Sequence, residues 1–115
     1  MNKKKLSDFG GMTIPQTRNK SFDKESGACC FIAAVYATMY PEAFALYVKT
    51  NLDKYGYVPF SPLFAELKKE YPELSYKVEY KNRDECVLWP EIMYMNDTEE
   101  LSFAQIAEEL AKLGY

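Results

Sequence analysis

The chain has 115 residues, a length that suits one domain. Its composition, 48% apolar and 16% aromatic, is typical of a globular protein and excludes a fully disordered chain. The net charge of −3 is divided unevenly. Residues 1–24 carry six basic and two acidic side chains, whereas residues 25–115 carry eight basic and fifteen acidic ones. An acidic body argues against direct nucleic-acid binding, because phosphate neutralisation needs clustered Lys and Arg.

Residues 1–24 hold Gly10, Gly11, Pro15 and many small polar side chains, and we expect an irregular basic N-terminal arm, packed in part through Phe9 or Ile14. Residues 25–115 are expected to form a single compact domain. No apolar stretch approaches the roughly 18 residues of a membrane span, and none follows the lysines near the N-terminus. We therefore expect a cytoplasmic protein with no membrane association.

Three helices are expected in the first part of this domain. Residues 28–39 are apolar on all sides, which predicts a buried central helix capped by Ser26. A second helix over 41–55 begins with proline and carries apolar residues at three- and four-residue steps. Gly56 closes it. A third helix begins at Ser61 and ends before Pro72.

The pattern then changes to the two-residue period of a half-buried strand over 74–81. Residues 86–95 are almost continuously apolar, which predicts a second, fully buried strand interrupted at Pro90. Asp97 with Glu100 and Ser102 with Gln105 are both possible capping boxes before a terminal helix. The fold class is therefore α+β: three N-terminal helices, an antiparallel sheet of two or more strands, and a C-terminal helix.

Cys29 and Cys30 are the candidate reactive thiols, because a helix N-terminus favours the thiolate. A cysteine nucleophile usually needs a base, most often histidine, and the chain has none. The alternative interpretations are two small buried hydrophobic residues or a disulfide between one of them and Cys86. We expect reduced thiols. The adjacent cysteines and the missing histidine also predict no metal site, and no cofactor motif is present.

Two resemblances to known families are visible. The stretches 25–33, 61–78 and 88–92 resemble the catalytic-helix opening and following elements of papain-like, bacteriocin-processing cysteine peptidases. Ser26 stands where that family has its nucleophile and Lys20 where it has its oxyanion glutamine, so the resemblance implies a papain-like half-fold without catalytic residues. Residues 102–115 resemble the opening helix of a recombinase helix-turn-helix. The chain stops where the recognition helix would start, and we expect no DNA binding by this element.

We interpret the protein as a small, acidic, non-catalytic protein-binding domain of the inhibitor or adaptor type, such as mobile genetic elements carry. One alternative is a cysteine-dependent enzyme, or a degenerate papain-like fold, that uses Cys29 or Cys30. Another is an acidic nucleic-acid mimic built on the acids at 97, 99, 100, 108 and 109. The candidate partner-binding residues are expected to share one solvated face near the strand pair and the last helix: Lys77, Glu79, Lys81, Arg83, Asp84, Glu99 and Glu100.

Overall fold

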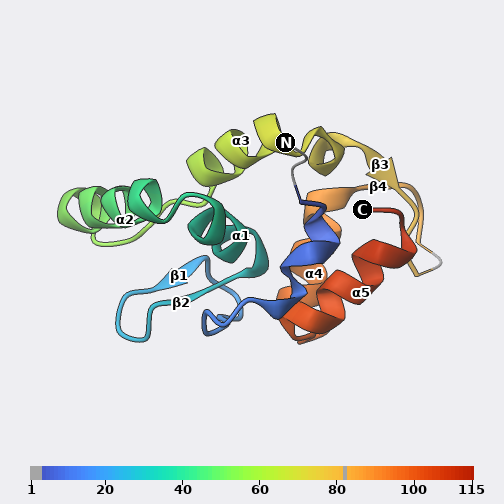
Figure 1. The fold of residues 1–115 in the computed structure, drawn as a ribbon, viewed down its shortest axis with the longest axis horizontal. Coiled ribbons are helices and arrows are strands. Elements are labelled where there is room, and N and C mark those ends of the chain that lie inside the picture. Colours follow the sequence, from blue (N-terminus) through green and yellow to red (C-terminus); the bar gives the residue numbers. More distant parts are fainter. Residues whose placement is uncertain (1–3, 82) are drawn as a thin grey trace.

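The structure, a computed structural model, describes residues 4–81 and 83–115. The fold is α+β, and helices dominate it (Figure 1). Its α-helices are α1 (Phe31–Met39), α2 (Pro41–Tyr55), α3 (Ser61–Glu70), α4 (Leu88–Asp97) and α5 (Phe103–Lys112). Its strands and 3₁₀ helices are β1 (Phe22–Asp23), β2 (Ala28–Cys29), β3 (Lys77–Val78), β4 (Cys86–Val87), η1 (Leu6–Gly11) and η2 (Pro72–Ser75). Lys3, counted above in the basic arm, lies outside the described residues.

The strands form two separate antiparallel pairs. β1 pairs with β2, with Phe22 opposite Cys29, and β3 pairs with β4, with Lys77 opposite Val87. Each strand has only two residues, so the helices supply most of the core. No helix in residues 4–81 and 83–115 is long and apolar enough to cross a bilayer.

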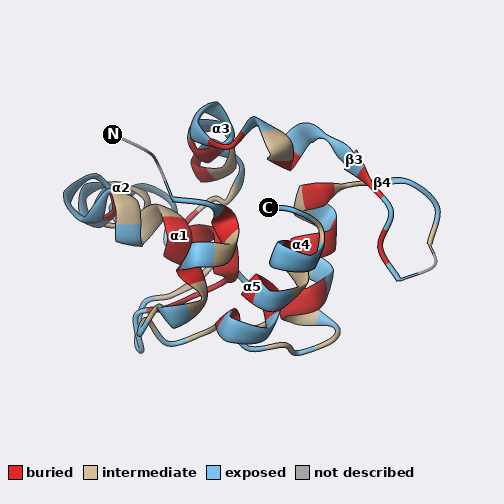
Figure 2. Cartoon of the chain, turned by 45° about the vertical axis from the view of Figure 1, so that its right-hand side comes forward, coloured by how far each residue is buried: buried red, intermediate tan, exposed pale blue. Residues whose placement is uncertain are grey.

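α1 lies at the centre of the core, as its apolar sequence predicts. Its first five residues, 31–35, are all buried, and only its last turn is partly open to solvent (Figure 2). The predicted start of this helix is wrong. Ala28 and Cys29 form β2, so the helix begins at Phe31 with Cys30 as its N-cap.

The turn between β1 and β2 explains why Ser26 does not cap α1. The Ser26 hydroxyl donates a hydrogen bond to Asp23 Oδ2 at 2.8 Å, inside the turn. Gly27 follows with a φ of 72°, a left-handed conformation that favours glycine, and its N–H donates to the Asp23 carbonyl at 2.8 Å. The side chain therefore stabilises a hairpin turn instead of a helix start.

α2 and α3 begin and end close to the predicted residues. Pro41 is the first residue of α2, and Gly56 ends it with a left-handed φ of 78°. Ser61 and Pro62 open α3. Phe44 is the only buried residue of α2, although its apolar residues repeat at helical spacing.

Both predicted strands after Pro72 are mostly helical or irregular. Residues 72–75 form η2, and pairing is confined to β3 and β4. The expected strand over 86–95 is wrong from Leu88 onward, where α4 begins. Pro90 is the third residue of α4, in the first turn where a missing N–H is tolerated. A continuously apolar run of this length fits a buried strand or a helix equally well.

The N-terminal segment is more ordered than predicted. The expectation of an irregular arm is wrong for residues 6–11, which form η1 and pack along α5 (Figure 1). Leu6 and Phe9 are buried in the core. At Gly10 an added Cβ would lie 2.8 Å from Ala107 Cβ, so the two backbones approach too closely for a larger residue. The Ser7 N–H donates to the Tyr115 carbonyl at 3.2 Å, which joins the two ends of the described chain.

Candidate functional site

The candidate thiols Cys29 and Cys30 lie inside the core. Their exposed fractions are 1% and 0%. Burial, and then the neighbouring Cys30, raise the pKa of the Cys29 thiol to about 12. Burial is also the main cause that raises the pKa of Cys30 to about 11. Buried thiols with raised pKa values stay protonated near neutral pH and are poor nucleophiles.

The third cysteine is separate from the other two. Cys86 is half-buried, and all three cysteines are free. A hydrogen bond with Glu91, followed by burial, raises the pKa of the Cys86 thiol. Within residues 4–81 and 83–115, no group of three or more Cys, Asp or Glu side chains is arranged to hold a metal ion.

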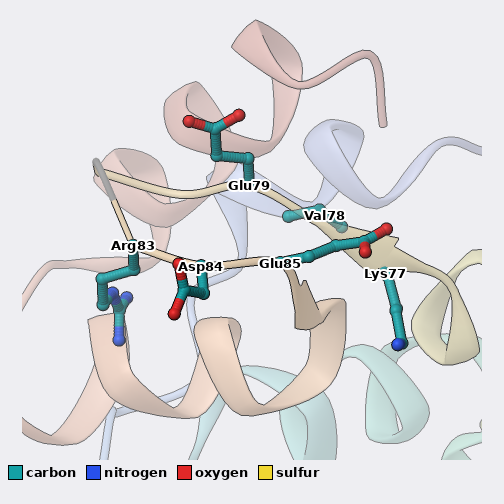
Figure 3. Close-up of a pocket in the computed structure, with 6 residues that line it drawn as sticks. All are labelled: Lys77, Val78, Glu79, Arg83, Asp84 and Glu85. Atoms are coloured by element: carbon teal, nitrogen blue, oxygen red, sulfur yellow. The ribbon is translucent and has the colours of Figure 1, made fainter.

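The predicted partner-binding face is brought together only in part. Lys77, Glu79, Arg83 and Asp84 line a hollow of about 460 Å³ in the β3–β4 hairpin, together with Val78 and Glu85 (Figure 3). Glu79 points away from the other charged side chains, whereas Arg83 and Asp84 point toward α4. The charges of this hairpin therefore do not present one uniform surface.

Lys81 and Glu99 interact with each other instead of facing solvent separately. Lys81 Nζ lies 2.5 Å from Glu99 Oε2, and the Tyr80 hydroxyl donates to Glu99 Oε1 at 3.0 Å. Burial raises the pKa of Glu99, but the hydrogen bonds from Lys81 and Tyr80 outweigh burial and lower it. The Glu99 side chain is only 19% exposed, so the expectation that it is a solvated position is wrong. Glu100 is exposed.

Arg83 is held by the protein in the same way. It forms an ion pair with Glu91, whose residue is 2% exposed on α4. Its guanidinium also lies 4.3 Å from the centre of the Tyr94 ring and 5.4 Å from that of Tyr80. These contacts fix the hairpin on α4 and occupy the group that would otherwise bind a partner.

The acids expected in a nucleic-acid mimic are also engaged within the chain. Asp97 accepts a hydrogen bond from the Asn19 N–H at 2.8 Å, Glu99 pairs with Lys81, and Glu109 lies 3.4 Å from Lys112. Only Glu100 and Glu108 of this set are exposed and form no ion pair with another described residue. The arrangement gives little support to an acidic surface that imitates a phosphate backbone.

A polar network that the sequence did not indicate connects the N-terminal segment to α4. Asn96 is fully buried, and its side chain accepts from Gln16 Nε2 at 2.7 Å and donates to the Thr17 carbonyl at 2.8 Å. Arg18 donates to the carbonyls of Asn96 and Leu101 at 2.6 and 2.7 Å. The positive charge of Arg18 at these carbonyls stabilises the C-terminal end of α4. The network therefore has a structural role, as the joint between the N-terminal segment and α4.

The second feature missed from the sequence is an apolar groove between α2 and β1, the α2–β1 groove. α2 contributes Phe44, Ala45, Val48, Lys49, Leu52 and Asp53, and β1 contributes Phe22, around a volume of about 490 Å³. A second hollow of about 450 Å³ shares Phe22 and Leu52 and continues past Lys20 and Lys24 to Tyr57. Because they share two lining residues, the two hollows adjoin and together make one depression beside α2.

Large exposed apolar residues gather around the same helix. Within the described residues there are six such side chains, and four of them lie on α2 or within two residues of its ends: Tyr40, Leu46, Tyr55 and Tyr57. Figure 2 shows α2 as mostly exposed, in contrast to α1 and α4. A single exposed leucine needs no explanation, but several large exposed apolar side chains on and around one helix that also lines an apolar groove are typical of a binding surface.

Comparisons with known proteins give no family for this chain. No family model matches it, and no curated protein or solved structure is significantly similar to it. The resemblance to papain-like peptidases stays a prediction.

The sequence contained part of the signal for the α2–β1 groove. The stripe of Phe44, Val48 and Leu52 is visible as helical periodicity, which does not show whether another element covers it. Leu46 lies off that stripe and was an available sign of a second apolar face. Nothing in the sequence pairs Gln16 or Arg18 with Asn96, because about 80 residues separate the partners.

Proposed function

We propose that the protein is a non-catalytic domain of the inhibitor or adaptor type, acting in the cytoplasm by binding another protein through the surface of α2. One observation carries this proposal: four of the six large exposed apolar side chains among the described residues lie on α2 or within two residues of its ends, and α2 also lines an apolar groove. Leu46 is 66% exposed and Tyr57 is 61% exposed. Exposed tyrosine and leucine of this kind become the central contacts of an interface when a partner covers them.

The internal pairing of the hairpin charges supports α2 over the hairpin as the binding surface. Lys81, Arg83 and Glu99 already have partners within the chain, and releasing them would cost part of any binding energy. The residues that stay available there are Lys77, Glu79, Asp84 and Glu100. Lys77, Glu79 and Asp84 belong to the β3–β4 hairpin, at the other end of the molecule from α2 (Figure 1), so we give them no part in this interface.

Two observations favour binding over a cysteine-dependent reaction. The thiols of Cys29 and Cys30 are shielded by the core, and their pKa values lie far above neutral pH. A thiolate nucleophile needs a lowered pKa and access for its substrate. The free cysteines also agree with a reducing compartment.

The test is affinity purification from the organism that encodes the chain, followed by mass spectrometry. We expect the wild-type protein to capture one partner in stoichiometric amount and the double variant Leu46→Glu/Tyr57→Ser to lose it. Tyr76→Ser is the matched control, because Tyr76 is also 61% exposed but lies far from α2 in sequence, beside β3. The control should capture the partner as the wild type does.

Two results would contradict the proposal. One is a wild-type protein that captures no stoichiometric partner. The other is a Cys29→Ala or Cys30→Ala variant that loses all biological activity with an unchanged melting temperature, together with rapid iodoacetamide labelling of that thiol at neutral pH. The second result would support the alternative interpretation, a cysteine-dependent enzyme.

A further inference from the structure

We propose that the α2–β1 groove receives an amphipathic α-helix of the partner, with apolar side chains in the groove and acidic side chains along its rim. This inference rests on the proposed function and specifies the chemistry of the partner. The argument uses the length of the groove, the rigidity of its floor and the charge around it.

The length of the apolar stripe fits a docked helix. Phe44, Val48 and Leu52 are spaced by four residues and lie on one side of α2. Eight residues of α-helix span about 12 Å, close to the roughly 10.5 Å between positions i and i+7 of a bound helix. Ala45 lies beside this stripe, and its small side chain leaves room for a large apolar residue of the partner. Two turns of helix can therefore place three apolar anchors along the groove.

The floor of the groove is held in place before binding. The rings of Phe22 and Phe44 meet edge to face with centres 6.0 Å apart. The Ser21 hydroxyl donates to the Val58 carbonyl at 3.1 Å, which connects the β1 side to the segment after α2. A surface that is already ordered loses less entropy when a partner binds.

An extended segment fits this site less well than a helix. A bound strand gains its affinity from backbone hydrogen bonds along an open sheet edge. β1 is paired with β2 along one edge, and its other edge offers only two residues to a bound strand. A helix satisfies its own backbone groups and needs only side-chain contacts.

The charges around the depression favour an acidic partner. Its lining contains three lysines and two aspartates, a net of +1, whereas the whole chain carries −3, which leaves −4 for the rest. Asp23 is already engaged by the Ser26 hydroxyl at 2.8 Å and by Lys20 at 3.7 Å. Lys24 and Lys49 are exposed and form no ion pair with any described residue. These two ammonium groups are available to acidic side chains that flank the apolar anchors.

The experiment selects a displayed library of 16-residue helical peptides on the intact wild-type protein. Positions i, i+4 and i+7 are fixed as apolar and the others are randomised. We expect the selected sequences to be enriched in Asp and Glu, and their affinities to be measured by fluorescence polarisation. Ala45→Arg, which fills the groove from an exposed position, should weaken binding more than about tenfold.

Lysine substitutions provide the matched comparison of charge. Lys49→Glu should weaken binding about fivefold and reduce its dependence on salt, because it removes one rim charge pair. Lys77→Glu makes the same charge change at an exposed lysine of the β3–β4 hairpin and should leave binding within about twofold. Circular dichroism checks that all three variants remain folded.

Several outcomes would overturn the inference. These are selected peptides that are basic or neutral, peptides whose binding Ala45→Arg leaves unchanged, and a library that yields no binder. Binding to anionic vesicles that Lys49→Glu abolishes, without peptide binding, would assign the groove to a lipid surface. If the host partner is captured as before by the Ala45→Arg variant, the proposed function stands and only the groove assignment fails.

Discussion

The N-terminal segment has a mostly polar sequence and α2 has an apolar stripe, yet the structure buries part of the segment and leaves most of α2 exposed. Residues 4–20 are mostly polar, yet Leu6 and Phe9 are buried and the segment is hydrogen-bonded to the end of α4. α2 has a regular apolar stripe, yet Phe44 is its only buried residue. Figure 1 shows the difference: η1 lies against α5, whereas α2 extends away from the centre.

This difference shows that the burial of a helix depends on which other elements pack against it. Two apolar anchors suffice for η1, because Gly10 and Ala107 allow its backbone to approach α5 closely. A full amphipathic stripe does not bury α2, because Tyr47, Val48 and Leu52 pack against the core with only part of their surface and stay half-buried. Its uncovered part is what we assign to a partner. Three pairs of variants test this comparison.

The largest contrast is expected between two leucines. Leu6→Ala removes a fully buried side chain of η1 and should lower the free energy of unfolding by about 3 kcal/mol. Leu46→Ala removes one that is 66% exposed on α2 and should change it by less than about 0.5 kcal/mol. Urea denaturation followed by circular dichroism measures both. Equal effects would show that the N-terminal segment does not belong to the core.

Substitution of one asparagine in each region should give a smaller difference in the free energy of unfolding. Asn96→Leu removes the group that binds Gln16 and the Thr17 carbonyl, and should cost about 2 kcal/mol because buried partners are left unpaired. Asn51→Leu on α2 removes only a bond of 2.8 Å to the Tyr47 carbonyl one turn earlier, and should change stability by less than about 0.5 kcal/mol. Thermal unfolding of both variants measures the difference. A neutral Asn96→Leu would show that the joint between this segment and α4 contributes no stability.

The smallest effect is expected from two neighbouring glycines. Gly10→Ala introduces a Cβ that would lie 2.8 Å from Ala107 Cβ and should cost about 1 to 2 kcal/mol. Gly11→Ala meets no atom within 4 Å and should be neutral or slightly stabilising. The paired measurement of melting temperature separates packing from backbone entropy. Similar losses for both variants would contradict the close approach of η1 and α5.

Local signals determined the helix boundaries that the sequence predicted correctly. Pro41 at the start and Gly56 at the end of α2 act through their own backbone conformation, as does the capping box of Ser102 and Gln105 on α5. The apolarity of residues 31–35 likewise predicts that α1 is central, because a segment without a polar side must be buried. These features depend on residues within a few positions of one another.

Only the tertiary structure decided the rest. The run over 86–95 could have formed a strand or a helix, and α4 forms because Leu88, Ile92 and Met95 find the core on one side. The pairing of Arg83 with Glu91 and the burial of Asn96 depend on which elements meet, as does the groove beside α2. The spacing of apolar residues in the sequence shows on which side of an element they lie. Whether another element covers them is a property of the whole fold, and in α2 it leaves open the surface that we propose for binding.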